Sequence, residues 1–126
     1  MEMRYKEGRV RQPERFLDIE GEYDIIVAGG GIAGVGAAIA SAESGCKTLL
    51  IEKETALGGL ATLGLVNIPL DHLSNIGKQM FEEMEKVNAL RRRNSDPEKH
   101  KLVLDRMVLK TGCGILFDTY VVDSIM

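Results

Sequence analysis

The sequence contains few of the residues that build metal centres and disulfide frameworks. Two cysteines and two histidines occur among 126 residues. Cys46 and Cys113 lie far apart and form no CxxC pair, so we expect free thiols in a reducing compartment. His72 and His100 have no second ligand at metal-binding spacing, and we expect both at the surface. The sequence therefore predicts no metal site and no redox-active cysteine pair.

Long apolar runs and a strong net charge are also missing. Every apolar run is far shorter than the ~20 residues of a membrane span, and the N-terminus does not resemble a signal peptide. The formal net charge is −3, which gives no reason to expect nucleic acid or an anionic membrane as a partner. We interpret the three arginines at 91–93 as a solvated turn. We predict a cytoplasmic protein that binds neither nucleic acid nor a membrane.

Glycine, by contrast, is frequent, with 14 residues, and it is clustered. The run YDIIVAGGGIAGVGAAIASAESGCKTLLIEKETALGG holds most of the pattern. Within it, residues 24–28 predict a strand buried on both faces, and residues 48–51 a second buried strand. Between them, the alanine-rich residues 32–44 end before a glycine and predict a helix. The two strands would be parallel, with a right-handed crossover.

The rest of the chain adds two helices and a later part of the sheet. Residues 74–89 have apolar side chains at helical spacing. Asp96 and Pro97 suit the N-cap and first position of a helix that runs to about Thr111. The runs GILF and TYVVDSI then predict strands. The predicted fold class is α/β: a Rossmann-like βαβ domain with a parallel sheet, incomplete.

We expect an N-terminal arm at residues 1–22 and a dinucleotide-binding domain at residues 23–126, with an insertion at about residues 53–95. The sequence ends inside a strand pattern. We therefore expect a fragment or truncated chain from which the substrate domain is absent.

The glycine motif Gly29-x-Gly31-x-x-Gly34 has the context that dinucleotide binding requires, because a strand precedes it and a helix starts within it. Gly29 allows the tight turn between strand and helix. Gly31 lets a pyrophosphate lie against the backbone, and Gly34 lets the helix pack close to the sheet. The motif therefore predicts a pyrophosphate site.

The flanking residues complete this prediction. Ile32 and Ala33 stand at the start of the helix, where free N–H groups and a partial positive charge attract phosphate. Glu52 follows the last motif glycine by 18 residues and ends the second strand, where a carboxylate accepts bonds from the adenosine ribose hydroxyls. Lys53 is its solvated neighbour, near the ribose.

The strand–helix–strand unit does not by itself distinguish FAD from NAD. The early position of the motif, the second glycine pair Gly58 and Gly59, and the long insertion before the third strand favour FAD. Two alternatives stay open. One is an NAD-dependent dehydrogenase or a thiazole-synthase-like dinucleotide-binding protein, and the other is a non-catalytic nucleotide-binding subunit.

The stretch from YDIIVAGGG to GGLATLGLV resembles the start of FAD-dependent oxidoreductases of the glutathione-reductase-like superfamily. With the later DPEKHKLVLDRMVLKTGCGILFDTYVVDSI, it is most similar to the branch related to the flavin subunit of heterodisulfide reductase. The resemblance covers roughly residues 23–126. It implies an enzyme that transfers hydride or electrons through FAD, although this chain alone is not expected to be competent.

The resemblance also implies roles for single residues. Gly29, Gly31 and Gly34 would meet the pyrophosphate, with Gly58 and Gly59 along the pyrophosphate or ribose. Thr62 would approach the flavin, and the backbone of Val121 would meet the adenine. It identifies no catalytic residue. The expected partners are FAD, an unknown small-molecule or electron-carrier substrate, and another chain or the missing C-terminal part.

Overall fold

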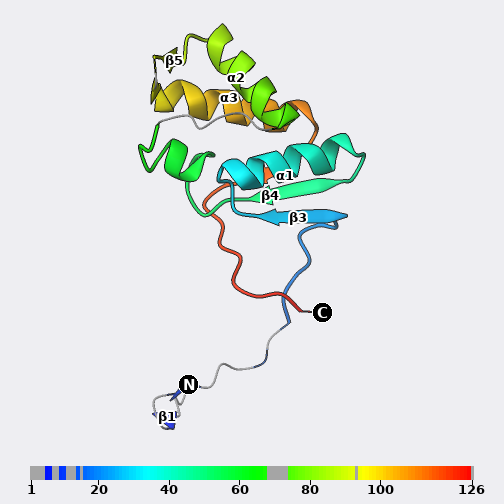
Figure 1. The fold of residues 1–126 in the computed structure, drawn as a ribbon. Helices are drawn as coiled ribbons and strands as arrows, with labels where there is room; N and C mark the ends of the chain where they lie inside the picture. The colour runs from blue at the N-terminus through cyan, green and yellow to red at the C-terminus, as the bar shows by residue number, and fades with distance from the viewer. Residues whose placement is uncertain are drawn as a thin grey trace.

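The structure is a computed structural model that describes residues 5–6, 9–10, 14, 16–67, 74–92 and 94–125. Its elements, in chain order, are β1 (Tyr5–Lys6), β2 (Arg9–Val10), β3 (Ile25–Ala28), α1 (Ile32–Glu43), β4 (Thr48–Ile51), the 3₁₀ helix η1 (Gly59–Ala61), α2 (Asn75–Lys86), β5 (Leu90–Arg91), β6 (Asn94–Ser95), α3 (Pro97–Lys110) and β7 (Gly114–Leu116). The main sheet has three parallel strands in the order β3-β4-β7. The three α-helices lie on one side of it (Figure 1).

The predicted strand–helix–strand unit is present. β3 and β4 pair in parallel from Ile25↔Thr48 to Ala28↔Ile51, with α1 as the connection between them. β4 occupies the predicted residues and is the central strand, so Thr48, Leu49 and Leu50 are all buried. The α/β fold class with a parallel sheet is confirmed.

The main core lies between this sheet and the helices. Its buried members are Val35, Ala38, Ile39, Leu50, Leu57, Leu104, Val108 and Cys113. They come from α1, β4, the segment after β4, α3 and the residue just before β7, so residues distant in sequence share one core. Complete burial of a leucine such as Leu50 stabilises a fold by about 1.5–3 kcal/mol.

Side-chain caps start both later helices. The hydroxyl of Ser74 accepts a bond from the Gly77 N–H (3.0 Å) and caps α2. Asp96 caps α3 as predicted, because its Oδ1 accepts from the N–H groups of Glu98 (3.1 Å) and Lys99 (3.2 Å), and proline follows it at the first helical position. These caps satisfy N–H groups that a helix leaves unpaired.

One strand prediction is wrong in its burial. We expected the strand at residues 24–28 to be buried on both faces, but Ile25 is 39% exposed and Ile26 is 57% exposed. The reason is topological: β3 is an edge strand, and among the described residues no helix covers the face opposite α1 (Figure 1). The apolar run that is typical of a buried strand is present, but among the described residues no helix packs on the outer face of β3 (Figure 1).

The last predicted strand does not form. β7 covers Gly114–Leu116, but residues 119–125 of the run TYVVDSI pair with no strand in the described part of the chain. Asp118 takes a left-handed conformation (φ 55°), and its N–H donates to the Glu54 carbonyl (3.2 Å), beyond the end of the β4–β7 ladder. Val121 and Val122 beyond it are exposed.

The structure also describes part of the N-terminal arm, the two cysteines and the length of the helices. The arm contains a short antiparallel pair, β1 with β2, and its described residues Phe16 and Leu17 are exposed. Cys113 is buried and Cys46 half-buried, both as free thiols. Among the described residues, no helix has the length and apolar character that a membrane crossing requires.

Candidate cofactor site

The turn after β3 is built by two of the motif glycines. Gly29 has a φ of +105°, a conformation that favours glycine, and its N–H donates to the Ile51 carbonyl of β4 (2.7 Å). A Cβ built on Gly34 would lie 1.8 Å from the Gly29 carbonyl oxygen, whereas Cγ1 of Val27 on β3 would be 3.6 Å away. The missing side chain at Gly34 therefore matters mainly because the Gly29 carbonyl lies directly against α1 at this position. It matters less for the packing of the helix on the sheet.

The start of α1 is open and carries no negative charge. A Cβ built on Gly31 would meet nothing within 4 Å, and Gly31 is the N-cap without a side-chain cap. No acidic residue lies in the first turn, where Ile32 and Ala33 are exposed. The N–H groups of such a helix end carry partial positive charge. This geometry fits a phosphate group beside Gly31.

Glu52 lies against the glycine loop. It is only 6% exposed. Its Oε2 accepts from the Gly30 N–H (2.5 Å), and its Oε1 accepts from the Glu54 N–H (2.8 Å). A carboxylate has about four acceptor positions, so Glu52 retains acceptor capacity for a ribose hydroxyl while it holds the loop.

Gly30 is more constrained than its variable place in the motif suggests. Besides its bond to Glu52, its carbonyl accepts from the Gly58 N–H (2.8 Å). A Cβ at Gly30 would lie 2.5 Å from Leu57 Cδ2 and 3.0 Å from Glu52 Oε2. Sequence reasoning missed this residue because the motif assigns no task to its position. Only the unbroken run of three glycines at residues 29–31 hinted at the close packing.

The second glycine pair packs against the first loop. Gly58 and Gly31 form an isolated parallel bridge, and a Cβ on Gly59 would lie 3.3 Å from the Gly31 Cα. Both Gly58 (φ 103°) and Gly59 (φ 53°) are left-handed. The structure thus brings together the predicted residues Gly29, Gly31, Gly34, Glu52, Gly58 and Gly59 at the carboxyl ends of β3 and β4. In open α/β sheets this is where ligands bind.

Thr62 is near this junction, but its side chain is not accessible. It is completely buried (0% exposed), and its hydroxyl donates to the Leu57 carbonyl (2.6 Å). Its contact with a flavin stays a prediction. In this conformation the Thr62 side chain faces the protein interior.

The remaining predicted residues lie farther from the junction. Lys53 is exposed and pairs with Glu54, with 3.3 Å between Nζ and Oε1. Val121 is 53% exposed and belongs to no strand. The chain does return to Glu52 just before it, because the Thr119 N–H donates to the Glu52 carbonyl (3.1 Å). The predicted ribose and adenine contacts stay predictions.

His100 corrects another expectation. We expected a surface histidine, but it is 3% exposed on α3 and neither ring nitrogen has a hydrogen-bond partner among the described residues. Burial lowers the pKa of its imidazole. Its spacing from the buried Leu104 and Val108, one and two helical turns later, was the signal that could have placed it in the core. His72 lies outside the described residues.

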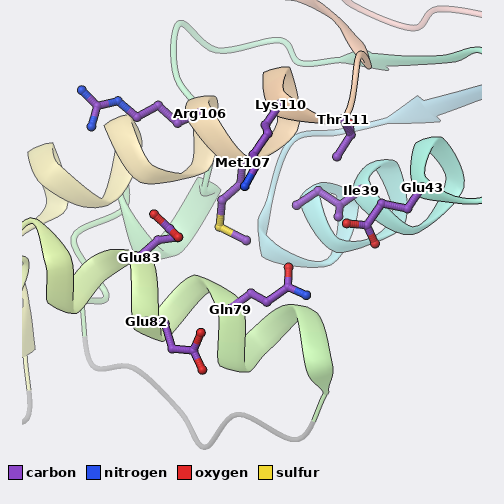
Figure 2. Close-up of a pocket in the computed structure, with 9 residues that line it drawn as sticks. All are labelled: Ile39, Glu43, Gln79, Glu82, Glu83, Arg106, Met107, Lys110 and Thr111. Carbon is purple, nitrogen blue, oxygen red and sulfur yellow. The ribbon is translucent and has the colours of Figure 1, made fainter.

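A separate hollow lies among the three helices. It has a cavity volume of about 470 Å³. Figure 2 shows acidic, basic and apolar side chains from α1, α2 and α3 around it. The lining residues are Ile39, Glu43, Gln79, Glu82, Glu83, Arg106, Met107, Lys110 and Thr111. None of them is a predicted cofactor residue, so this hollow is distinct from the glycine junction.

Comparison with known proteins assigns the chemistry of the family. A family model described as "FAD dependent oxidoreductase" matches residues 24–126. The match confirms the expectation of an FAD-dependent oxidoreductase, with FAD as the cofactor. It does not address the narrower resemblance to the heterodisulfide reductase branch.

Individual relatives match shorter parts of the chain. The tRNA uridine 5-carboxymethylaminomethyl modification enzyme MnmG of Geobacter sulfurreducens is 45% identical over 60 residues, which are 40% of this chain and 10% of that protein. Fumarate reductase (cytochrome) of Shewanella frigidimarina is 52% identical over 40 residues, 32% of this chain and 7% of that protein. The chain thus spans a tenth or less of the length of these curated relatives.

A solved structure supports the fold. The geranylgeranyl bacteriochlorophyll reductase-like protein of Thermoplasma acidophilum superposes with a TM-score of 0.57 at 19% identity, and the match covers 82% of this chain and 32% of that one. At this identity the likeness concerns the fold alone.

Proposed function

The chain belongs to the family of FAD dependent oxidoreductases, and from this premise we propose that residues 23–126 form the FAD-binding portion of a larger flavoenzyme. The observation that carries the proposal is the junction of three segments. The open start of α1, the Glu52 carboxylate and the Gly58–Gly59 turn meet at Gly30 and Gly31: the Gly30 N–H donates to Glu52, the Gly30 carbonyl accepts from Gly58, and Gly31 pairs with Gly58. These are the features that an adenine dinucleotide needs at one end of a sheet.

We assign each part of the cofactor to the group that suits it. The pyrophosphate lies at Gly29, Gly31 and Gly34, where the first N–H groups of α1 at Ile32 and Ala33 face it. Two observations support this: a Cβ at Gly31 would point into open space, and no side chain caps the helix. The phosphates need no lysine there, because the helix end itself supplies the positive charge.

At the adenosine end, Glu52 accepts bonds from the ribose hydroxyls, and Lys53 lies beside it. The backbone of Val121 meets the adenine. The return of the chain to the Glu52 carbonyl through the Thr119 N–H supports this placement. The carboxylate also repels a 2′-phosphate, which favours a cofactor with a free ribose.

When bound, FAD supplies the hydride or electron transfer of the family. The residues of this chain bind and orient its adenosine and pyrophosphate. Gly58 and Gly59, which pack against Gly31 at the start of α1, would bind it beside the glycine loop. We assign no catalytic residue in this chain, and the substrate, a small molecule or an electron carrier, is contacted by parts of the enzyme beyond residues 23–126.

We further propose that this chain alone is not a competent enzyme. Its β3 edge and the face of the sheet opposite the helices expose apolar side chains, with Ile26 57% and Leu116 46% exposed. A parallel sheet is normally covered on both faces. Later residues of the same polypeptide or another chain would provide the cover. A purified chain that, as a monomer with bound FAD, catalyses turnover with a donor and an acceptor would contradict this proposal.

Two narrower assignments complete the proposal. The branch related to the flavin subunit of heterodisulfide reductase, within the glutathione-reductase-like superfamily, is supported by the quoted stretches of sequence. A reducing, cytoplasmic location is supported by two free thiols.

The test is a cofactor titration of the chain and of a Gly31→Val variant. Gly31 has a φ of −64°, which any residue adopts, and a Cβ added there meets no protein atom within 4 Å. We therefore expect the variant to fold but to bind FAD at least tenfold more weakly, because valine fills the space of the pyrophosphate. Gly36→Ala is the matched control, since it lies on α1 with the same open surroundings and should bind normally.

The spectrum of the bound cofactor separates the alternatives. Bound flavin gives absorption bands near about 370 and 450 nm, a property of the cofactor itself. A protein that binds NAD but not FAD would identify an NAD-dependent dehydrogenase instead. Bound FAD that no donor reduces, even in the longest polypeptide that contains this chain, would identify a non-catalytic nucleotide-binding subunit.

A further inference from the structure

The Gly58–Gly59 turn has its own support behind it, on the side away from the glycine loop. The support is Thr62, whose side chain is completely buried. Its hydroxyl donates to the Leu57 carbonyl at 2.6 Å, and its N–H donates to the Gly59 carbonyl at 3.2 Å. Thr62 therefore bonds to the residues immediately before and after Gly58, and it closes the turn around that residue.

The space around Gly58 is filled by this support. A Cβ on Gly58 would lie 2.5 Å from Thr62 Cγ2, 2.6 Å from Thr62 Oγ1 and 2.9 Å from Leu104 Cδ1 of α3. No residue other than glycine fits there without displacing a buried side chain, and the left-handed φ of 103° excludes most residues as well. The position of the Gly58 backbone is thus set from behind by Thr62 and Leu104.

The front of the same turn meets the glycine loop. The Gly58 N–H donates to the Gly30 carbonyl (2.8 Å), and Gly58 pairs with Gly31 in a parallel bridge. A displacement of Gly58 therefore moves the partner of Gly30, which also donates to Glu52. In this way a buried hydroxyl that touches no open surface is linked to both ends of the proposed site.

We propose that Thr62 is a positioning residue: its hydroxyl sets the Gly58–Gly59 turn as the second wall of the pyrophosphate site and does not touch the flavin. This inference rests on the proposed function, because it takes the glycine junction as the FAD site. It differs from the role that the family resemblance implies, in which Thr62 approaches the flavin directly.

The experiment compares FAD with ADP, which has the adenosine and the pyrophosphate but no flavin. Both ligands are titrated by calorimetry into the complete chain and into Thr62→Val and Thr62→Ser variants. Thr62→Val keeps the shape but leaves the buried Leu57 carbonyl unpaired. We expect it to raise the Kd of both ligands by about tenfold, which corresponds to about 1.4 kcal/mol. Thr62→Ser keeps the hydroxyl and should stay within about threefold of the unchanged chain.

The outcomes separate the two hypotheses and the proposal beneath them. If Thr62→Val weakens FAD but leaves ADP binding unchanged, the hydroxyl contacts the flavin and the inference is wrong. Unchanged affinity for both ligands also overturns it. If the unchanged chain binds neither ligand, the proposed function fails, and the inference fails with it.

A second measurement needs no variant and covers the case in which Thr62→Val does not fold. If the Gly58–Gly59 turn already has its final position without ligand, the Gly58 amide should exchange slowly in the ligand-free chain, because its N–H donates to the Gly30 carbonyl. Amide hydrogen exchange measures this protection. Slow exchange at Gly58 without ligand supports the inference, and exchange as fast as that of an unprotected loop amide overturns it.

Discussion

The two faces of the main sheet differ sharply in how far this chain completes them. Toward the helices, Leu50 of the central strand is fully buried, and Val27 and Ile115 pack against the same core. On the opposite face, Leu49 of the central strand is buried, but Ile26 of β3 and Leu116 of β7, on the strands at either side of it, are 57% and 46% exposed. The same three strands supply both sets of side chains. The difference therefore comes from what lies on the sheet and not from what the strands are made of.

The candidate site belongs to the completed side of this comparison. Its hydrogen bonds, from Gly30 to Glu52 and from Gly58 to Gly30, join segments within residues 29–58. The local geometry of the pyrophosphate site is thus set by this part of the chain. The sheet that presents it has an uncovered face. We expect substitutions within residues 29–58 to have large effects on stability or FAD binding. Substitutions on the open face of the sheet should change stability little.

The largest effect is expected at Gly34. In a Gly34→Ala variant the Cβ would lie 1.8 Å from the Gly29 carbonyl oxygen. Because that oxygen belongs to the backbone and a Cβ is fixed rigidly to its Cα, the two atoms can separate only if the turn opens. We expect a loss of at least about 3 kcal/mol in the free energy of unfolding, near the upper end for single substitutions. Urea denaturation followed by circular dichroism measures it.

Gly36→Ala is the control for this prediction. It lies two residues further from the loop on the same helix, and an added Cβ meets nothing within 4 Å. Alanine in a helix interior is more favourable than glycine by roughly 0.5–1 kcal/mol, so we expect unchanged or raised stability. Equal losses in the two variants would show that the turn is not the constraint.

A second pair of variants tests the faces of the sheet directly. Leu50→Ala should lower the free energy of unfolding by about 2–5 kcal/mol, the range for removing a buried leucine side chain. Ile26→Ala, on the neighbouring strand but the open face, should change it by less than about 1 kcal/mol, because much of the side chain already contacts water. The same denaturation experiment applies. A loss at Ile26 as large as at Leu50 would mean that this face is covered in solution.

A third pair separates the framework of the site from its ligand-facing surface. Gly30→Ala would place a Cβ 2.5 Å from Leu57 Cδ2 and 3.0 Å from Glu52 Oε2, and we expect a loss of about 1–3 kcal/mol, as for other overpacked positions. Gly31→Ala meets no atom within 4 Å and should cost less than about 1 kcal/mol as an N-cap change. Denaturation without ligand gives both values.

FAD titration of the same pair sharpens the contrast. Gly31→Ala should bind FAD more weakly than the unchanged chain although its free energy of unfolding is almost the same, since its methyl group occupies the proposed phosphate space. If Gly31→Ala binds FAD as tightly as the unchanged chain, the phosphates do not lie where we propose.

The sequence predicted the parts of this molecule that depend on local chemistry. The β4 strand, α1 and the Asp96 cap follow from runs of residue types and from spacing, and each is where it was expected. The exposure of Ile26 could not be predicted, because an apolar run shows what a strand suits and not what covers it. The constraints on Gly30 and Thr62 arise from contacts with Glu52, Leu57 and Gly58, and no motif position encodes them.

The smallest predicted effect concerns His100, whose buried imidazole lies on α3 with no hydrogen-bond partner among the described residues. Burial lowers its pKa from the ordinary value of 6.5. The unfolded chain therefore binds a proton at a higher pH than the folded chain does. The free energy of unfolding should be at its full value above pH 6.5 and should fall as the pH drops toward the lowered pKa. For one group the slope cannot exceed about 1.4 kcal/mol per pH unit.

The matched variant is His100→Leu, which removes the titrating group and keeps an apolar side chain in the core. Denaturation between about pH 7.5 and 5.5 should show a smaller pH slope for the variant than for the unchanged chain, where one His accounts for the difference. Asp105 acts in the opposite direction at lower pH, because burial raises the pKa of its carboxyl from 3.8, and so the comparison stays above that range. Identical slopes in the two chains would show that His100 is hydrated or partnered in solution. The orphaned imidazole would then be, like the open face of the sheet, a place where a further part of the protein or solvent completes the packing.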